Sequence, residues 1–240
     1  MMYKKIVILL MGCVSLFGTE KTSLTVGTNA EFPPFSYKEG EVLVGFDIDI
    51  AKEVGKRLGK EIKFKDMPFE ALLPDLMLGG IDFIAAGMSI TEERGKRVNF
   101  TKSYLTGDPL VLLTLIDKKA TLEELMGKVI VVNEGFTADS FISSKSGYET
   151  LRLAVSADAF LALQKGRAAA FITAKSTVDA FFAVQDPAKF HVGFLEETSE
   201  SCALVFSKKN TKLLAEIQAV LDEMEKDGTL LQYKVKWKLV

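Results

Sequence analysis

The chain has 240 residues, of which 48% are hydrophobic, and its formal net charge is −2. This length allows one large hydrophobic core or two modest ones. No basic run is present that would neutralise a phosphate backbone, which argues against nucleic acid as a partner. The two cysteines and one histidine form no cluster spaced for a metal ion, so we expect neither a metal nor a cofactor.

A short basic and apolar leader opens the chain. Lys4 and Lys5 precede the apolar residues 6–11, a run far shorter than the roughly 20 residues that span a bilayer as a helix. We therefore interpret residues 1–19 as a signal or lipoprotein leader with a short tether. This leader predicts that the remaining chain works outside the cytoplasm, in the periplasm or on the outer face of the cytoplasmic membrane.

The leader contains one candidate lipid attachment site. Leu10-Met11-Gly12-Cys13 resembles the bacterial lipobox, in which a diacylglycerol is attached to the cysteine. The alternative is an ordinary signal peptide that is cleaved near residues 17–19 and removes Cys13. If Cys13 carries lipid, Cys202 has no partner for a disulfide within the chain.

The first half of the chain alternates strand and helix patterns. Apolar residues recur every four positions between Asp47, which we expect to cap a helix, and Gly59, which we expect to end it. A second amphipathic run begins at Phe69 and stops at a glycine pair, and a nearly all-apolar run follows, as in a strand covered on both faces. The predicted elements are strands at 23–28, 61–65 and 81–86 and helices at 47–58 and 69–78.

The second half repeats this alternation. We predict strands at 109–115, 128–132, 151–155, 168–172 and 203–206, a short capped helix at 121–124, and helices from 137, at 157–164 and at 213–224. Two such repeats predict two α/β lobes. No linker rich in Gly, Ser or Pro separates them, so we expect extended strand crossovers near 106–110 and 201–204.

Several long motifs occur in an order that resembles one known family. They are TNAEFPPFSY at 28–37, VGFDIDIAKEVGKRLG at 44–59, FEALLPDLMLGGIDFIAAGMSITEERGKRVNFTKSY at 69–104, GRAAAFITAK at 166–175 and DGTLLQYKVKW at 227–237. This set resembles the family 3 extracellular solute-binding proteins, which serve ABC importers of polar amino acids. The resemblance covers the chain from about residue 28 onward.

The resemblance implies a type II periplasmic binding protein fold and a function. Each lobe would be a βαβαβ-type sheet covered by helices, with residues 20–107 and 204–240 in lobe 1 and 108–203 in lobe 2. A small ligand would bind between the lobes, and a monomer would deliver it to an ABC permease. Two alternatives are an enzyme of the same fold, such as a cyclic-acid dehydratase, and a ligand-sensing protein. We expect a binding protein and not an enzyme, because no catalytic triad or carboxylate pair is evident.

The resemblance also implies which residues of the first lobe bind the ligand. The arginine matching Arg94 holds the ligand's α-carboxylate, for which a guanidinium offers two parallel hydrogen bonds. Ser89 and the backbone of Gly87 match positions that hydrogen-bond the same ligand. The alternative for Arg94 is a surface ion pair with Glu92 or Glu93.

Aromatic residues of the first lobe are expected beside the ligand's side chain. Phe32 and Phe69 match positions whose rings flank it, whereas we expect three other phenylalanines, at 35, 46 and 83, in the core. Asn29 stands where some relatives have an aspartate that faces a cationic or amide side chain. A neutral residue there weakens a claim for lysine or arginine, although Glu31 or Glu70 lies close in sequence.

The second lobe departs from the family pattern at two positions. Most relatives have threonine where Phe136 stands in Gly135-Phe136-Thr137, and this threonine or its backbone helps to bind the carboxylate; Thr137 remains a candidate. Ala174 replaces an aspartate that neutralises the ligand's α-ammonium, a contact worth about 2–5 kcal/mol. We therefore expect weaker binding of ordinary α-amino acids unless Glu134, Asp139 or Asp179 takes over. The residues do not predict which ligand is bound.

Overall fold

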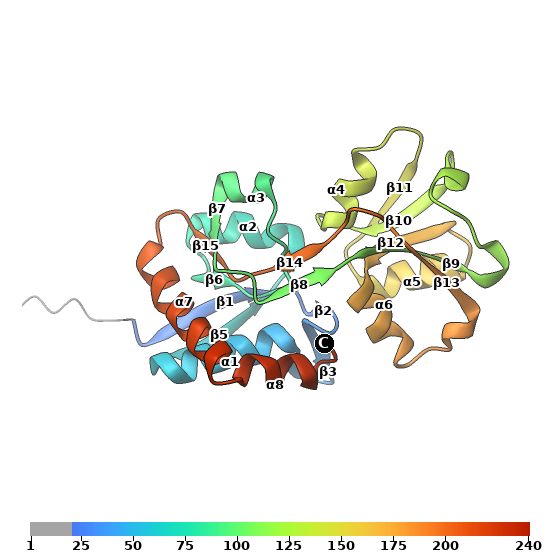
Figure 1. Ribbon diagram of the computed structural model, residues 1–240. Coiled ribbons are helices and arrows are strands. Elements are labelled where there is room, and N and C mark those ends of the chain that lie inside the picture. The colour runs from blue at the N-terminus through green and yellow to red at the C-terminus, as the bar shows by residue number, and fades with distance from the viewer. Residues whose placement is uncertain (1–20) are drawn as a thin grey trace, which may run out of the picture.

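The computed structural model describes residues 21–240, and the predicted leader with Cys13 lies outside this range. Two lobes lie side by side, each with its own five-stranded sheet and helices, and two extended strands run between them (Figure 1). None of the helices within residues 21–240 is long and apolar enough to cross a membrane.

The sheet of the first lobe combines strands from both ends of the chain. Its order is β5-β1-β6-β15-β7, with β1 parallel to β5 and β6, and β15 antiparallel to β6 and β7. A small second sheet holds three short strands. The bounds are β1 Ser23–Thr28, β5 Glu61–Asp66, β6 Phe83–Ile84, β15 Val205–Ser207 and β7 Val98–Phe100, and, in the small sheet, β2 Glu31–Phe32, β3 Ser36–Glu39 and β4 Val42–Val44.

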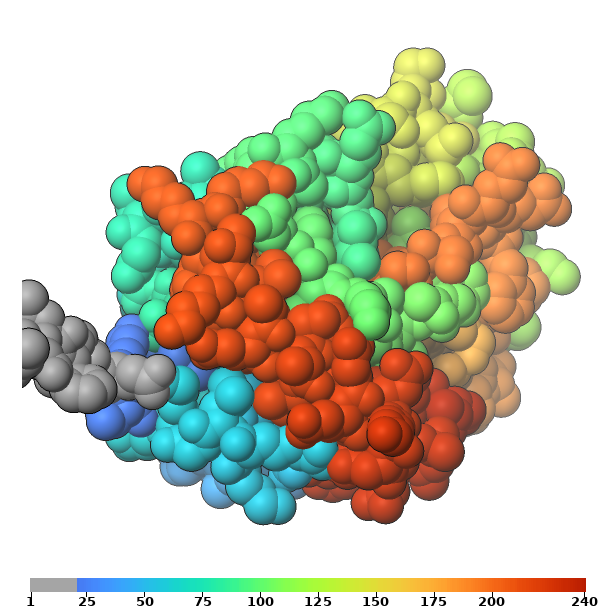
Figure 2. Space-filling model, turned by 60° about the vertical axis from the view of Figure 1, so that its left-hand side comes forward, coloured from blue at the N-terminus to red at the C-terminus, as the bar shows by residue number. Residues whose placement is uncertain are grey.

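Five helices belong to the first lobe. Their bounds are α1 Phe46–Leu58, α2 Phe69–Leu78, α3 Glu92–Arg97, α7 Thr211–Lys226 and α8 Thr229–Lys236. Both α7 and α8 pack against α1, so the end of the chain lies across the same lobe as its beginning (Figure 2). An ion pair of 2.8 Å between Arg57 and Asp227 joins α1 to the turn between α7 and α8. The helix α8 is not among the predicted elements.

The second lobe is built from the middle of the chain. Its sheet has the order β11-β10-β12-β9-β13, in which β10 runs parallel to β11 and β12. The strand bounds are β9 Leu110–Leu115, β10 Val129–Asn133, β11 Glu149–Leu153, β12 Ala170–Ala174 and β13 Phe190–Phe194. The helices are α4 Thr137–Ser143, α5 Ser156–Gln164 and α6 Lys175–Phe182. Short 3₁₀ turns lie at Ile116–Lys118, Glu123–Leu125 and Pro187–Lys189.

Each sheet buries apolar side chains on both of its faces. Along β10, Val131 packs into one cluster while Ile130 and Val132 pack into another on the opposite face, as the two-residue repeat of a strand requires. Burying one such side chain stabilises the fold by about 1.5–3 kcal/mol. The first lobe also has two hydrophobic clusters of its own. Phe35, Phe46 and Phe83 lie in one of them, as predicted.

Several details of the predicted elements are wrong. The helix predicted at 121–124 is a 3₁₀ turn at Glu123–Leu125, and the strand predicted at 151–155 lies at Glu149–Leu153. Helix α1 begins after Gly45, and Asp47 lies inside it, fully buried, instead of capping it. The predicted strand at 81–86 forms ladder pairs only over Phe83–Ile84. The strand predicted to end at residue 172 continues to Ala174, because Thr173 and Ala174 pair with β9.

Two crossovers connect the lobes. Strand β8 (Leu105–Asp108) leads out of the first lobe, and β14 (Glu200–Cys202) leads back into it. They pair with each other in antiparallel fashion, and β14 also bridges to Ser89. These strands lie at the positions where the sequence predicts crossovers. Strand β14 therefore lies between the two lobes, beside β8 (Figure 1).

Candidate ligand-binding cleft

Arg94 lies at the junction of the two lobes. Its Nη1 donates to the carbonyl of Ser89 in the first lobe at 2.8 Å, and its Nη2 donates to the carbonyl of Gly135 in the second at 3.0 Å. Its guanidinium carbon stands 5.5 Å from the centre of the Phe69 ring, within the range of a cation–π contact. Burial lowers the pKa of Arg94 from its usual value, and the nearby Glu200 acts in the opposite direction.

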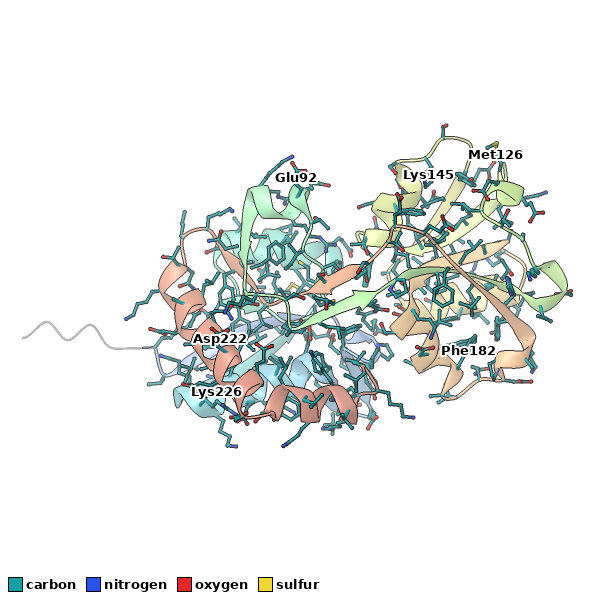
Figure 3. All side chains as sticks on the ribbon, in the orientation of Figure 1. Glu92, Met126, Lys145, Phe182, Asp222 and Lys226 are labelled. Carbon is teal, nitrogen blue, oxygen red and sulfur yellow. The ribbon has the colours of Figure 1, made fainter. Side chains whose placement is uncertain are left out.

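The alternative of a surface ion pair for Arg94 is wrong. Glu92 pairs instead with Lys96 at 3.2 Å, and it points outward at the edge of the first lobe (Figure 3). Within the described chain, no carboxylate lies within 4.0 Å of the Arg94 guanidinium. The guanidinium thus bonds only to neutral carbonyl oxygens, which a ligand carboxylate can replace with stronger, charge-assisted bonds.

Ser89 and Gly87 lie on the loop that leads from β6 to α3. Ser89 is 4% exposed, and its backbone pairs with Cys202 of β14. The N–H of Gly87 donates to the carboxylate of Asp47, and its carbonyl accepts from the Cys202 thiol. A Cβ on residue 87 would stand 2.8 Å from the Phe32 ring, so the close approach of this loop to the aromatic rings requires glycine.

Asp47 supports this loop from behind. Its carboxylate also accepts a hydrogen bond from the Tyr104 hydroxyl at 2.9 Å. Complete burial raises the pKa of Asp47 to about 7, although the Gly87 and Tyr104 hydrogen bonds act to lower it. Asp47 therefore holds the loop that carries Gly87 in place, a role that the sequence pattern did not reveal.

Three aromatic rings meet where the resemblance places the ligand's side chain. Phe136 of the second lobe enters between Phe32 and Phe69 of the first. Its ring centre lies 4.1 Å from that of Phe69 in a stacked arrangement and 4.7 Å from that of Phe32 edge-on. Phe32 and Phe69 thus flank a ring of the protein itself. In this closed arrangement Phe136 fills the slot between them.

Two cavities surround this aromatic cluster. The outer one, of about 250 Å³, is lined by Phe69, Arg94, Gly135 and Thr137 among others. The inner one, of only about 10 Å³, lies between Phe32, Phe136, Thr137, Ala174 and Glu200. Ligand sites usually enclose about 300–1,000 Å³, so the inner cavity admits a ligand only if the lobes open or Phe136 moves.

The remaining predicted residues lie at different depths. Thr137, at the start of α4, donates its hydroxyl proton to the carboxylate of Glu200 and lines both cavities. Asn29 is 4% exposed, donates to the Met67 carbonyl at 3.2 Å and lines neither cavity. Glu31 and Glu70 are exposed, and of the two only Glu70 lines one of these cavities, the outer one.

The acids considered as substitutes for an aspartate at position 174 lie elsewhere. Asp139 pairs with Arg152 at 3.0 Å, Asp179 is exposed and pairs with Lys175, and Glu134 is exposed. Glu200 of β14 was missed by the sequence reasoning, yet its buried carboxylate lines the same inner cavity as Ala174. The only sequence signal was its place directly before the crossover predicted at 201–204.

The electrostatic surroundings of Glu200 are unusual for a carboxylate. Burial raises its pKa to about 7, and Asp108 of the neighbouring strand β8 acts in the same direction. The Ser89 side chain and the charge of Arg94 act to lower it. Arg94 and Glu200 are therefore close enough for each charge to affect the pKa of the other, and no salt bridge joins them among residues 21–240.

Comparison with known proteins shows the family to which the chain belongs. The profile of the family described as "Bacterial extracellular solute-binding proteins, family 3" matches residues 24–240. The arginine-binding extracellular protein ArtP of Bacillus subtilis (strain 168) is 30% identical over 220 residues, covering 90% of this chain and 86% of that protein. A probable histidine-binding protein of Campylobacter jejuni is 33% identical over 210 residues, covering 86% of this chain and 81% of that protein.

Solved structures agree in fold. A mutant of ArgBP from T. maritima has a TM-score of 0.84 and 39% identity, with 90% of this chain and 95% of that chain covered. An ancestral arginine-binding protein bound to arginine has a TM-score of 0.84 and 35% identity, with 90% and 98% covered. The predicted family and the type II periplasmic binding protein fold are confirmed. The chain belongs to the family 3 bacterial extracellular solute-binding proteins.

Proposed function

We propose that this chain is the substrate-binding protein of an ABC importer and captures an amino acid or a related small carboxylate between its lobes. The observation that carries the proposal is Arg94, whose guanidinium spans the junction and bonds only to the carbonyls of Ser89 and Gly135. Arginine-binding and histidine-binding proteins among the relatives, and an ancestral protein bound to arginine or to glutamine, support an amino acid as the ligand.

The other parts of the proposed site follow from its geometry. Arg94 holds the α-carboxylate, Ser89 and Thr137 offer hydroxyls beside it, and Phe32 and Phe69 flank the ligand's side chain. Gly87 and Asn29 act from behind this layer, since their amide groups bond to Asp47 and Met67. We assign residues 20–107 and 204–240 to lobe 1 and 108–203 to lobe 2, with β8 and β14 as the hinge.

Closure of the hinge provides the signal for transport. A ligand that contacts both lobes binds the closed form more tightly than the open one and shifts the population toward it. The permease then recognises the closed monomer. A dehydratase activity is less well supported. One structural neighbour is a precursor of cyclohexadienyl dehydratase, but it is itself described as an ancestral amino acid-binding protein.

Thermal unfolding with a panel of compounds tests the proposed function. We expect one or a few amino acids to raise the melting temperature by about 5 °C or more. A ligand at 100 times its Kd adds about 2.7 kcal/mol of stability, and each kcal/mol corresponds to about 2–4 °C for a chain of this size. The panel contains the standard amino acids and small carboxylates. The proposal fails if none of them shifts the melting temperature while the protein unfolds cooperatively.

Replacing Cys13 by serine tests the lipid anchor. We propose that a lipid on Cys13 attaches the protein to the outer face of the membrane, with a signal peptide that removes Cys13 as the alternative. Cys13→Ser should release most of the protein from the membrane fraction, because the acyl chains provide the binding energy. Cys202→Ser is the matched control. If the Cys13 variant stays membrane-bound after a high-salt wash, the lipid anchor is refuted.

A further inference from the structure

Glu200 is a buried carboxylate without a cationic partner. It is 9% exposed, and no lysine, arginine or histidine among residues 21–240 lies within 4.0 Å of its oxygens. Among residues 21–240, one side chain donates a hydrogen bond to its carboxylate, through the hydroxyl of Thr137. An ionised carboxylate accepts about four hydrogen bonds, so this partner leaves it incompletely satisfied. Burying such a group is costly unless a cation arrives to compensate.

Glu200 lies near the cleft arginine, and the two side chains line neighbouring cavities, the inner one and the outer one. It belongs to β14, the returning crossover, and its side chain lines the inner cavity together with Phe32, Phe136 and Ala174. Arg94 lies near enough for each charge to affect the pKa of the other, yet the guanidinium bonds to carbonyls instead of to this acid. The cleft thus presents separated positive and negative charges to a molecule that enters it.

This separation matches the two charges of a free α-amino acid. We propose that Glu200 binds the ligand's α-ammonium group while Arg94 binds its α-carboxylate, an assignment that rests on the proposed function. Glu200 then supplies from the hinge strand the negative charge that Ala174 lacks on β12. The sequence-based expectation of weak binding of α-amino acids is replaced by an expectation of ordinary, tight binding.

The assignment has a consequence for the pH dependence of binding. With its pKa raised to about 7, Glu200 is largely protonated at pH 6 in the free protein and largely ionised at pH 8. Only the carboxylate attracts an ammonium group, so affinity should rise about tenfold over this range. The charged or titratable groups that face Glu200 are Arg94, Asp108 and Cys202. Asp47 also has a pKa near 7, but it does not line the cavity.

The test uses Glu200→Gln and pairs of ligands that differ only in the amino group. The pairs are L-arginine with guanidinovalerate, L-histidine with imidazolepropionate, and L-glutamine with glutaramate, measured by calorimetry. For the amino acid that binds the wild type, we expect Glu200→Gln to weaken binding roughly thirtyfold or more and to abolish the pH dependence. For its partner without the amino group, we expect a change of less than about threefold.

Controls and outcomes separate this assignment from the proposed function. Glu196→Gln removes the same charge from the exposed turn before β14 and should leave affinity unchanged. An equal loss for both members of a pair would show that Glu200 faces the ligand's side chain or only shapes the cleft, and would overturn the assignment. Unchanged amino-acid affinity in Glu200→Gln would overturn it as well. A wild type that binds no amino acid would overturn the proposed function itself.

Discussion

Replacing Arg94 by alanine should weaken ligand binding from about thirtyfold to several thousandfold without unfolding the protein. Removing one partner of a desolvated charge pair costs about 2–5 kcal/mol, and each 1.4 kcal/mol is a factor of ten in affinity. Arg94 belongs to none of the four hydrophobic clusters, so its loss leaves them intact. Calorimetry with the amino acid that most stabilises the wild type measures the change.

Two further variants locate the effect in the guanidinium. Arg94→Lys keeps the charge but loses the planar pair of donors, so we expect an intermediate loss of affinity. Lys96→Ala removes a cation from the same helix, where Lys96 is exposed and pairs with Glu92 alone among residues 21–240. We expect affinity within about twofold of the wild type for that control. If Arg94→Ala binds as tightly as the wild type and melts at the same temperature, Arg94 lies outside the site.

The fold was largely predictable because its strands and helices follow strong periodic patterns. The βαβ alternation, the glycine at the end of α1 and the apolar strand β9 each have a local cause that the sequence displays. Gly59 adopts a φ of 64°, which is the left-handed conformation that ends a helix. Helix α8 was missed because it is short and half-exposed, and it is held by contacts with α1 that no local pattern reveals.

The candidate site was only partly predictable, because two of its acids act through contacts between distant segments. Asp47 resembles a helix cap in sequence, but its buried carboxylate instead bonds to Gly87 and Tyr104, 40 and 57 residues away. Glu200 follows two other glutamates, Glu196 and Glu197, with no motif to mark it out, and only the pairing of β14 with β8 brings it to the inner cavity. Such partners depend on the tertiary fold.

Phe136 shows a different limit of sequence-based prediction. The sequence indicated that a bulky residue replaces threonine in the loop after β10, and thus a narrower corner of the cleft. It did not indicate that the ring would enter between Phe32 and Phe69, the two residues expected to flank the ligand. The Phe136 ring therefore occupies the place between Phe32 and Phe69 where we expect the side chain of the ligand to bind.

Replacing Phe136 by threonine should tighten amino-acid binding by about tenfold. Each aromatic pair contributes about 0.5–1.5 kcal/mol beyond its buried area, and a ligand that enters the slot must break the pairs with Phe32 and Phe69. Removing the ring also destabilises the closed form without ligand. Small-angle scattering should therefore show a larger radius of gyration for the free variant and a larger contraction when the ligand binds.

Phe141→Thr is the matched control. It removes a half-buried ring from α4, the helix that begins directly after Phe136, and this ring packs against the core of the second lobe and lines neither cleft cavity. It should lower the melting temperature while leaving the affinity within about twofold, because packing in one lobe does not distinguish the open form from the closed one.

Phe136→Thr separates two roles of the ring. If the ring only fills the empty slot, affinity rises; if it stacks on the bound ligand, affinity falls. A fall in affinity with an unchanged radius of gyration would show that Phe136 is a ligand contact and that the slot is not occupied in solution without ligand.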